Sequence, residues 1–356
     1  MSQTHSQRSV VYEIAILGRL TINAHSLNNE GTVGNVVEPR TVSLADGTPT
    51  DGISGEMLKH LHAEAYWAVA SAKENFCTNC KKLDPGKASG SQSVMEIISA
   101  LKKIEKNKRS KKTGENEGDE AQGKSDTANQ ELKDLDKNLV KELREQGVNR
   151  VLSEALKCPL CNAHGFLIEE YALSRKSTIE FGWALALPNT LSRDVHTHTR
   201  VAPGEKRKEV DTEGVGAAQA IYNRPTRSGI YAFLSVFQPW RIGLHDVSLQ
   251  YIGSSDLRRQ IYDWTLEAYK AMFVRLEGAM TTTRLPHVTG CKGLVVHTAG
   301  HFPVPIVSPL ADNYYESIEE LKVKAKIPII IEEFNSLADL LGVLDELKNS
   351  EPAKIV

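Results

Sequence analysis

The chain has 356 residues, of which 40% are hydrophobic and 25% charged, and its formal net charge is −2. Such a composition is ordinary for a globular protein with a large core, in one elaborated domain or two. The near-neutral charge disfavours non-specific coating of nucleic acid, but it is compatible with a local basic groove.

The first clearly patterned stretch runs from Val10 to Trp67. Residues 10–23 (VVYEIAILGRLTIN) are rich in β-branched and aromatic residues, which predicts a strand. A polar loop rich in Gly and Asn follows, and a helix is expected to begin after Ser54, a suitable N-cap. Apolar residues recur there at helical spacing: Met57, Leu58, Leu61, Ala65 and Val69. Such a corner could bind a nucleic-acid backbone, although many strand–loop–helix units bind nothing.

A change of composition follows the first helix. Residues 102–112 read KKIEKNKRSKK, and the residues after them are almost devoid of apolar side chains. The stretch 102–130 is therefore expected to be a mobile insertion, because it cannot bury enough surface to offset its ordering entropy. Its basic run could contact nucleic acid or be a solvated charge cluster. Leucines then recur at near-helical spacing and predict a helix that returns to the body: Leu132, Leu135, Leu139 and Leu143.

Two strands and a long excursion are expected in the second half of the chain. The strands are predicted at 177–187 and 228–237, and the polar, basic stretch 188–226 between them reads as an extended hairpin. A helix at about 255–280 and a strand at 293–299 follow. Without the insertions, the elements run strand, helix, strand, strand, helix, strand, which is the order of an RRM or ferredoxin-like domain.

The predicted fold class is therefore α+β, with an RRM/ferredoxin-like core, a thumb-like insertion, a charged helical insertion and a carboxy-terminal appendage. The expected division is a first half of the palm (9–76), an inserted helical region (77–176), a second half of the palm (177–310) and the appendage (311–356). A last strand, IPIIIEEF, and a helix opening at Ser336 belong to the appendage. This fold carries RNA binders and many other proteins, so it does not decide function.

Two CxxC pairs flank the charged insertion: Cys77, Cys80, Cys158 and Cys161. Four thiolates in two pairs at this spacing are typical of a tetrahedral structural zinc site that would tie the ends of the insertion together. Unrelated cysteines or a redox pair are the alternatives, and His164 could replace one cysteine. Cys291 stands alone and is expected to be a small buried hydrophobe.

Several further segments carry a family resemblance in a fixed order. LTINAHSLNNEGTVGNVVEPRTV, ISGEMLKH, HTRVAP and AAQAIYNRPTRSGIYAFLSVF together resemble the repeating backbone subunit of type I CRISPR surveillance complexes (Cascade). The resemblance is to the autoregulator (DevR-like) family, closest to the archaeal type I-A branch, and reaches from about residue 10 to 310. No single motif is unique to that family, whereas the ordered set is fairly specific.

The resemblance implies a structural role in which several copies polymerise along one CRISPR RNA. The thumb at 188–226 would reach over the guide onto the next copy, and exposed guide bases would pair with the target DNA strand. Head-to-tail contacts give a filament, alongside other Cascade subunits. The segments that hold the guide in such proteins match residues that could bond phosphate or ribose here: Asn23, Ser26, Asn28, Asn35, Arg40, Lys59, His60, His198, Arg200, Arg224 and Arg227.

Two other functions stay open. A loop aspartate, Asp46 or Asp51, could cut RNA with a divalent metal, as in backbone subunits of type III complexes, although ISGEMLKH follows the type I pattern. A stand-alone regulatory RNA-binding protein is the other alternative. No Walker, Rossmann, nucleophile-elbow or HExxH motif is present, so no enzymatic activity is expected. The amino terminus has no secretory pattern and no apolar run could span a membrane, which predicts a cytoplasmic protein.

Overall fold

The computed structural model describes residues 9–34, 36–114, 145–201, 219–278 and 280–355. The chain divides into two compact units, each assembled from separated stretches of sequence. The first unit comprises Met1–Ala65, Ile179–Gln238 and Leu266–Ala353, and the second comprises Tyr66–Thr178, Pro239–Thr265 and Lys354–Val356. Among the described residues, no helix is long and apolar enough to cross a bilayer.

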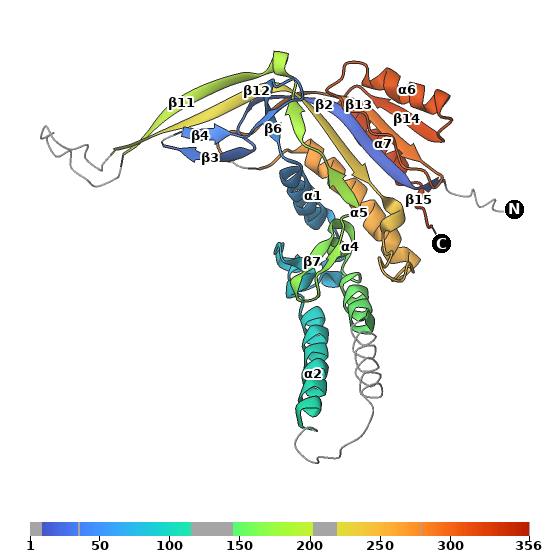
Figure 1. Ribbon diagram of the computed structural model, residues 1–356. Coiled ribbons are helices and arrows are strands. Elements are labelled where there is room, and N and C mark those ends of the chain that lie inside the picture. Colours follow the sequence, from blue (N-terminus) through green and yellow to red (C-terminus); the bar gives the residue numbers. More distant parts are fainter. Residues whose placement is uncertain (1–8, 35, 115–144, 202–218, 279, 356) are drawn as a thin grey trace, which may run out of the picture. The chain divides into compact units, whose positions relative to one another are not determined.

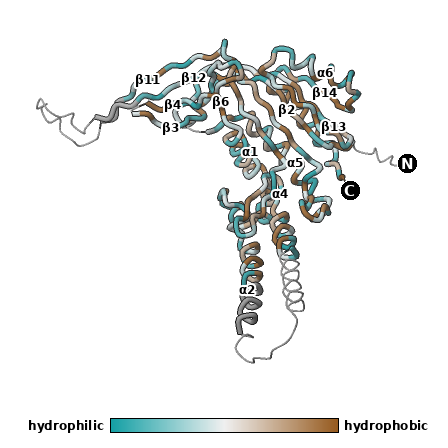
Figure 2. Tube along the Cα trace, in the orientation of Figure 1, coloured by the Kyte–Doolittle hydropathy of each residue, from teal (hydrophilic) through white to brown (hydrophobic). Residues whose placement is uncertain are grey.

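A sheet of 11 strands is the core of the first unit (Figure 1). Its central strands are β2 (Glu13–His25), β10 (Ala184–Ala186), β12 (Gln219–Phe237) and β13 (His287–Thr298). They lie side by side in the order β13-β2-β12-β10, and each neighbouring pair is antiparallel. Apolar residues make up most of β2, parts of which are coloured brown in Figure 2. The α+β class is confirmed.

Further strands extend this sheet on both sides. On one side, β14 (Ile329–Phe334) pairs with β13, so the predicted carboxy-terminal appendage is continuous with the main sheet. On the other side, β10 is followed by β6 and then β5. The bounds of the remaining strands of this unit are β1 (Val10–Val11), β3 (Asn29–Val33), β4 (Val36–Pro39), β5 (Thr41–Ser43), β6 (Pro49–Ile53), β9 (Ile179–Phe181), β11 (Ser192–Val201) and β15 (Glu351–Pro352).

Helices cover both faces of the sheet. On one face, α1 (Gly55–Val69) and α5 (Ser255–Val274) supply apolar side chains that meet Leu20 and Ile22 of β2. The expected N-cap of α1 is present, because the Ser54 hydroxyl accepts a hydrogen bond of 3.3 Å from the Met57 amide.

Two carboxy-terminal helices complete these layers. On the α1 and α5 face, α7 (Leu337–Leu347) is joined to α5 by the Lys270–Asp345 ion pair of 2.6 Å. On the opposite face, α6 (Tyr314–Lys324) packs its apolar side on Leu17 and Leu294. The central sheet is thus buried on both sides.

The second unit is mainly helical. It contains α2 (Gln92–Gly114), a helical stretch at 145–155, α4 (Pro159–His164) and a hairpin of β7 (Phe166–Ile168) and β8 (Leu173–Arg175). Its short 3-10 turns are η1 (Lys73–Asn75), η2 (Cys80–Lys82), η3 (Lys87–Gly90), η4 (Glu169–Tyr171) and η6 (Pro239–Arg241). The remaining turn, η5 (Pro188–Thr190), belongs to the first unit.

A buried arginine explains why this unit includes residues 239–265, which the sequence division placed in the palm. The Arg175 guanidinium donates hydrogen bonds to the carbonyl oxygens of Leu244 (2.6 Å) and Arg241 (2.7 Å), and it pairs with Asp246 at 2.8 Å. Burial costs such a cation its hydration, and these partners replace it. The arginine therefore fastens β8 to that stretch.

Several segments differ from the sequence prediction. The single strand expected at 177–187 is divided into β9 and β10. The expected loop after β2 contains a hairpin, β3–β4, whose turn at Gly34 has a left-handed φ of 57°. The Gly-Asn pair between valines is a hairpin signal that the polar composition obscured. Helix α5 ends at Val274 instead of 280, and Leu276, which lies beyond its end, is buried and 6% exposed. The 102–130 insertion is described only as far as Gly114, and the predicted leucine-containing helix at 132–143 lies outside the described residues.

A candidate nucleic-acid interface and a cysteine cluster

The predicted thumb begins as a regular two-stranded hairpin. Strand β11 pairs with β12 from Ser192 opposite Ser228 to Val201 opposite Gln219, and residues 202–218 lie outside the described part of the chain. His196 lies opposite Arg224 in this ladder. Because side chains alternate along a strand, the even-numbered positions of β11 share one face of the hairpin with the even-numbered positions of β12.

That face borders an open groove of about 760 Å³ in the first unit. Its opposite wall is the segment that leads from α5 into β13. The Arg284 guanidinium crosses from this wall and lies 3.1 Å from Nε2 of His198. The lining residues are Ala24, His196, Thr197, His198, Arg224, Thr226, Thr283, Arg284, Leu285 and His287.

The lining of this groove suits an anion. It carries two guanidinium groups, three imidazoles and three hydroxyl groups, and none of the residues that line it is acidic. Guanidinium groups form charge-assisted, often bidentate hydrogen bonds with phosphate, and hydroxyl and imidazole groups add neutral ones. The hydroxyl of Thr226 already orients His196, at 3.0 Å from its Nε2 atom. This arrangement can hold a nucleic-acid backbone without reading its bases.

A buried ionic network lies at the root of the same hairpin. Asp51 of β6 is fully buried, and its carboxylate accepts a hydrogen bond from the Arg193 guanidinium of β11. The Arg227 guanidinium of β12 is also fully buried, lies 3.9 Å from Asp51 and donates a 3.0 Å hydrogen bond to the Asn28 carbonyl oxygen. The Asn28 side chain in turn accepts a 2.9 Å hydrogen bond from the Ser54 amide. These contacts join the hairpin, β6 and the start of α1.

Three residues that were predicted to contact RNA are therefore engaged in contacts within the protein in this structure. Arg227 is not accessible to a phosphate in this structure, and the Asn28 amide oxygen caps a helix instead of facing solvent. Ser26 is also fully buried, with its hydroxyl 3.5 Å from the side-chain oxygen of Asn29. The residue types are suited to RNA contacts, but the local sequence could not show that the polar atoms of these side chains make hydrogen bonds within the protein.

Four other predicted residues do not line the groove, and they lie in different parts of the structure. Asn23 donates a hydrogen bond of 3.1 Å to Thr289 on the neighbouring strand. The Arg40 guanidinium lies over the Trp183 ring, 5.9 Å from its centre. On α1, Lys59 is half-buried, and His60 is exposed and lies 3.2 Å from Glu64.

His198 and Arg224 are thus the predicted residues that line the groove. Asn35 lies outside the described residues. Arg200 is described only as part of the backbone of β11.

The four predicted ligand cysteines meet in the second unit. The sulfur atoms of Cys77, Cys80, Cys158 and Cys161 all lie within 4.8 Å of one another, and all four are free thiols. The Cys161 sulfur lies 3.8 Å from that of Cys77 and 3.4 Å from that of Cys80. This cluster can bind a metal ion. The His164 imidazole is not part of it and lies edge-on against the Tyr66 ring.

The protonation of these thiols reflects their crowding. Hydrogen bonds with the other three thiols, first of all with Cys158, and burial raise the pKa of Cys161. The hydrogen bond with Cys158 also raises the pKa of Cys80, against an opposing effect of the hydrogen bond with Cys161. Hydrogen bonds from its neighbours lower the pKa of Cys77. Several adjacent thiolates repel one another, so all four thiols can ionise together only around a cation.

Residues 16–319 match the family model described as CRISPR-associated negative auto-regulator DevR/Csa2. The chain belongs to this DevR/Csa2 family. Solved structures that resemble it include chains of two CRISPR complexes. A chain of a "CRISPR RNA-guided surveillance complex, pre-nicking" has a TM-score of 0.51 and 13% identity, over 94% of this chain and 99% of that one. A chain of a second CRISPR RNA-guided surveillance complex has a TM-score of 0.44 and 9% identity, over 95% and 98%. No curated protein matches in sequence.

At such low identity the first of these likenesses concerns the fold alone. The groove of this DevR/Csa2 member also contains residues that the sequence prediction missed, namely Thr283, Arg284 and His287. They sit in TTTRLPH, a stretch between a helix and a strand with the polar composition of an ordinary connection. Only the antiparallel pairing of β13 with β2 brings this connection opposite the hairpin. A basic residue in a helix-to-strand connection was the available signal, and it is too common to be decisive.

Burial makes His25 a source of acid sensitivity. Burial, reinforced by the nearby Arg227 charge, lowers the pKa of His25 to about 3, so the imidazole is neutral in the folded state. A depressed histidine pKa stabilises the fold above its unfolded value of about 6.5 and costs stability below it. Between pH 6.5 and 5 we expect His25 to remove about 2 kcal/mol of unfolding free energy. Urea titrations at several pH values should show this slope flattened in His25→Gln, and an equal slope would contradict it.

Proposed function

We propose that this chain is a CRISPR RNA-binding backbone subunit of a type I surveillance complex, of the type I-A branch. Membership of the DevR/Csa2 family carries this proposal. The groove between the hairpin and the 283–287 segment supports it, because that groove is lined by cations and hydroxyls and by no acidic residue. Several copies bind one guide head-to-tail, the target DNA strand pairs with the exposed guide bases, and other Cascade subunits complete the particle.

In this function the protein contributes position and charge. Arg224 and Arg284 approach the guide from opposite walls and pair with phosphates, while His196 and His198 bond ribose or phosphate oxygens. No step requires acid–base or metal chemistry, so we assign no enzymatic activity. Asp51 is fully buried and held by Arg193, which leaves it unsuited to binding a catalytic metal at the surface. Asp46 is exposed, but it accepts a 2.9 Å hydrogen bond from the Thr48 amide as part of a turn.

We further propose that the cysteine cluster binds structural zinc. Tetrahedral Zn–S bonds of about 2.3 Å place the sulfur atoms roughly 3.8 Å apart. The 3.8 Å and 3.4 Å separations from Cys161 are close to this value, and the donor set consists of sulfur alone. Zinc would supply a closed cross-link and no reaction.

Light scattering after size-exclusion chromatography tests the RNA function, with two guide RNAs of which one is twice as long. We expect a particle whose mass rises with RNA length. The double variant Arg224→Glu/Arg284→Glu should bind roughly 100-fold more weakly, because two charge-assisted contacts of about 1.5 kcal/mol each are lost. A second pair, His198→Ala with Arg200→Ala, should also weaken assembly.

Lys324→Glu is the matched control, since Lys324 is 73% exposed on α6 and does not line the groove. It should leave assembly unchanged. A small particle of the same stoichiometry at both RNA lengths would contradict the backbone role and favour a discrete regulatory RNA-binding protein. Cutting of a complementary RNA that is lost in Asp46→Ala would instead favour a cleaving subunit.

A further inference from the structure

One lysine between the first CxxC pair and α2 makes its side-chain contacts inside the second unit. Lys87 is the first residue of η3, is half-buried and has a left-handed φ of 46°. A residue other than glycine keeps such a conformation only where the surrounding contacts fix it. Its Nζ atom donates hydrogen bonds to the carbonyl oxygens of His164 (3.2 Å) and Gly165 (3.1 Å). These carbonyls lie at the end of α4, the helix that contains Cys161, so Lys87 joins the two CxxC segments.

The ammonium group of Lys87 lies in the electrostatic field of the cysteine cluster. Burial lowers the pKa of Lys87, and negative charge on Cys161, Cys80 and Cys158 opposes that effect. The next residue, Ala88, is fully buried and lines a cavity of about 170 Å³ together with three of the four cysteines. Lys87 is thus a partly desolvated cation whose neighbouring anions are thiolates.

A zinc ion held by four thiolates needs such a cation. The complex carries a double negative charge, and three of the four cysteines are buried, so water screens that charge poorly. Glu154 and Lys157 also line the cavity, but their charges pair with each other at 2.7 Å. Lys87 therefore supplies a compensating charge that this pair does not.

We propose that Lys87 is a positioning residue for the metal, whose ammonium group compensates the charge of a zinc tetrathiolate and holds the two CxxC segments together. This inference rests on the zinc site proposed above. Lys87 is not a ligand, and it acts through the sulfur atoms. Its charge stabilises the anionic complex relative to the metal-free thiols, and it makes the bound thiolates weaker nucleophiles. Removal of an outer partner of this kind lowers metal affinity by about 10–100-fold in proteins.

Competition between the full-length protein and a chelator of known zinc affinity is the first test. Lys87→Met keeps the length of the side chain and removes its charge, so it should bind zinc about 10–100-fold more weakly. Lys87→Arg keeps the charge and should recover most of that loss. Lys81→Met is the matched control, because Lys81 follows Cys80 directly but is exposed, and water screens its charge.

The outcomes separate this inference from the zinc site itself. A wild-type protein that binds no zinc would overturn both. A wild-type protein that binds zinc, with equal affinity in Lys87→Met, would overturn the role of Lys87 alone. A loss of affinity in Lys81→Met as large as that in Lys87→Met would also contradict it, because any nearby positive charge would then suffice.

Cobalt bound in place of zinc gives a readout that a purely structural role would not change. A cation near the sulfur atoms lowers the energy of their electrons and so raises the energy of the sulfur-to-cobalt charge-transfer absorption. The cobalt-loaded Lys87→Met variant should therefore absorb at longer wavelength than the wild type, and Lys87→Arg should restore the wild-type position. An unshifted band in Lys87→Met would refute the role as counter-charge.

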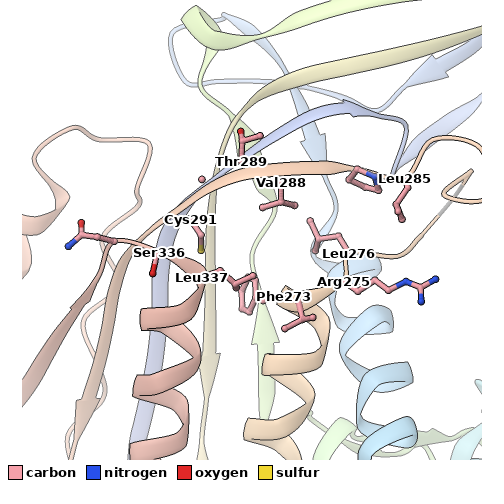
Figure 3. Close-up of a pocket in the computed structure, with 13 residues that line it drawn as sticks. Phe273, Arg275, Leu276, Leu285, Val288, Thr289, Cys291, Ser336 and Leu337 are labelled. Atoms are coloured by element: carbon pink, nitrogen blue, oxygen red, sulfur yellow. The ribbon is translucent and has the colours of Figure 1, made fainter.

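The fifth thiol is an internal reference for the reactivity of the cluster. Cys291 lies in the first unit and lines an apolar pocket with Phe273 and Leu337 (Figure 3). Burial raises the pKa of this thiol to about 12. Iodoacetamide should alkylate the four cluster thiols of the zinc-loaded protein several-fold faster in Lys87→Met than in the wild type, and Cys291 at the same slow rate in both. Equal acceleration of Cys291 would attribute the effect to general unfolding and contradict the proposal.

Discussion

Replacing Cys161 with serine should abolish metal binding and unfold the second unit. Cys161 is fully buried, and its sulfur lies against those of Cys77 and Cys80. Zinc held by four thiolates contributes binding free energy on the order of 10–16 kcal/mol, and folding uses that energy because the site does not exist in the unfolded chain. Elemental analysis should find about one zinc per wild-type chain and almost none in the variant. Thermal unfolding should lose the transition of this unit.

Cys291→Ser is the matched control for that experiment. Cys291 is also buried, but it lies in the first unit and outside the cluster. This variant should keep both the zinc content and the transition of the second unit. A wild-type protein that unfolds identically with and without a strong chelator would reject the zinc site, and intact folding of Cys161→Ser would do the same.

Removal of the Asp51 carboxylate should be the second most damaging change. It is the buried anion at the root of the hairpin, and its loss leaves the Arg227 guanidinium buried without a counter-charge. Burial already lowers the pKa of Arg227, an effect that the Asp51 charge opposes. Breaking one side of a buried pair costs about 3–5 kcal/mol, so Asp51→Ala should lower the urea midpoint strongly. Asp51→Asn should also destabilise, because an amide keeps the shape but not the charge.

Three comparisons give this experiment its meaning. Asp46→Ala should change stability by less than about 0.5 kcal/mol, since Asp46 is exposed. The double variant Asp51→Ala/Arg227→Met should recover part of the loss, because it removes the uncompensated charge. Unchanged stability in Asp51→Ala, with any RNA cutting abolished, would instead identify a catalytic carboxylate.

Local patterns in the sequence were sufficient for much of the fold. β-Branched and aromatic residues predicted β2, the strand expected at 228–237 is the second half of β12, and Ser54 with its periodic apolar residues predicted α1. The two CxxC pairs predicted the cluster, because ligand spacing is itself a local signal that constrains the fold around it. The α5 boundary was harder, since Leu276 continues the helical period although its side chain belongs to the core beyond the helix end.

The groove could be predicted only in part. His198 and Arg224 lie in a strongly polar strand pair and were found, but Arg284 arrives there through the pairing of β13 with β2. Conversely, Arg227 and Asn28 have the right chemistry for RNA and the wrong surroundings. Whether a polar atom faces solvent or an internal partner depends on residues almost 200 positions away in sequence, as in the hydrogen bond from Arg227 to Asn28. Residue type and spacing do not contain that information.

The cysteine cluster also affects how this protein can evolve. Because Cys77 and Cys80 meet Cys158 and Cys161 in space, the long stretch of chain between the pairs departs from and returns to one anchored point. The entropy of closing a loop grows only logarithmically with its length, so residues added or lost far from the anchor cost little. The length and the charge of this stretch can therefore change during evolution independently of the sheet and its basic groove.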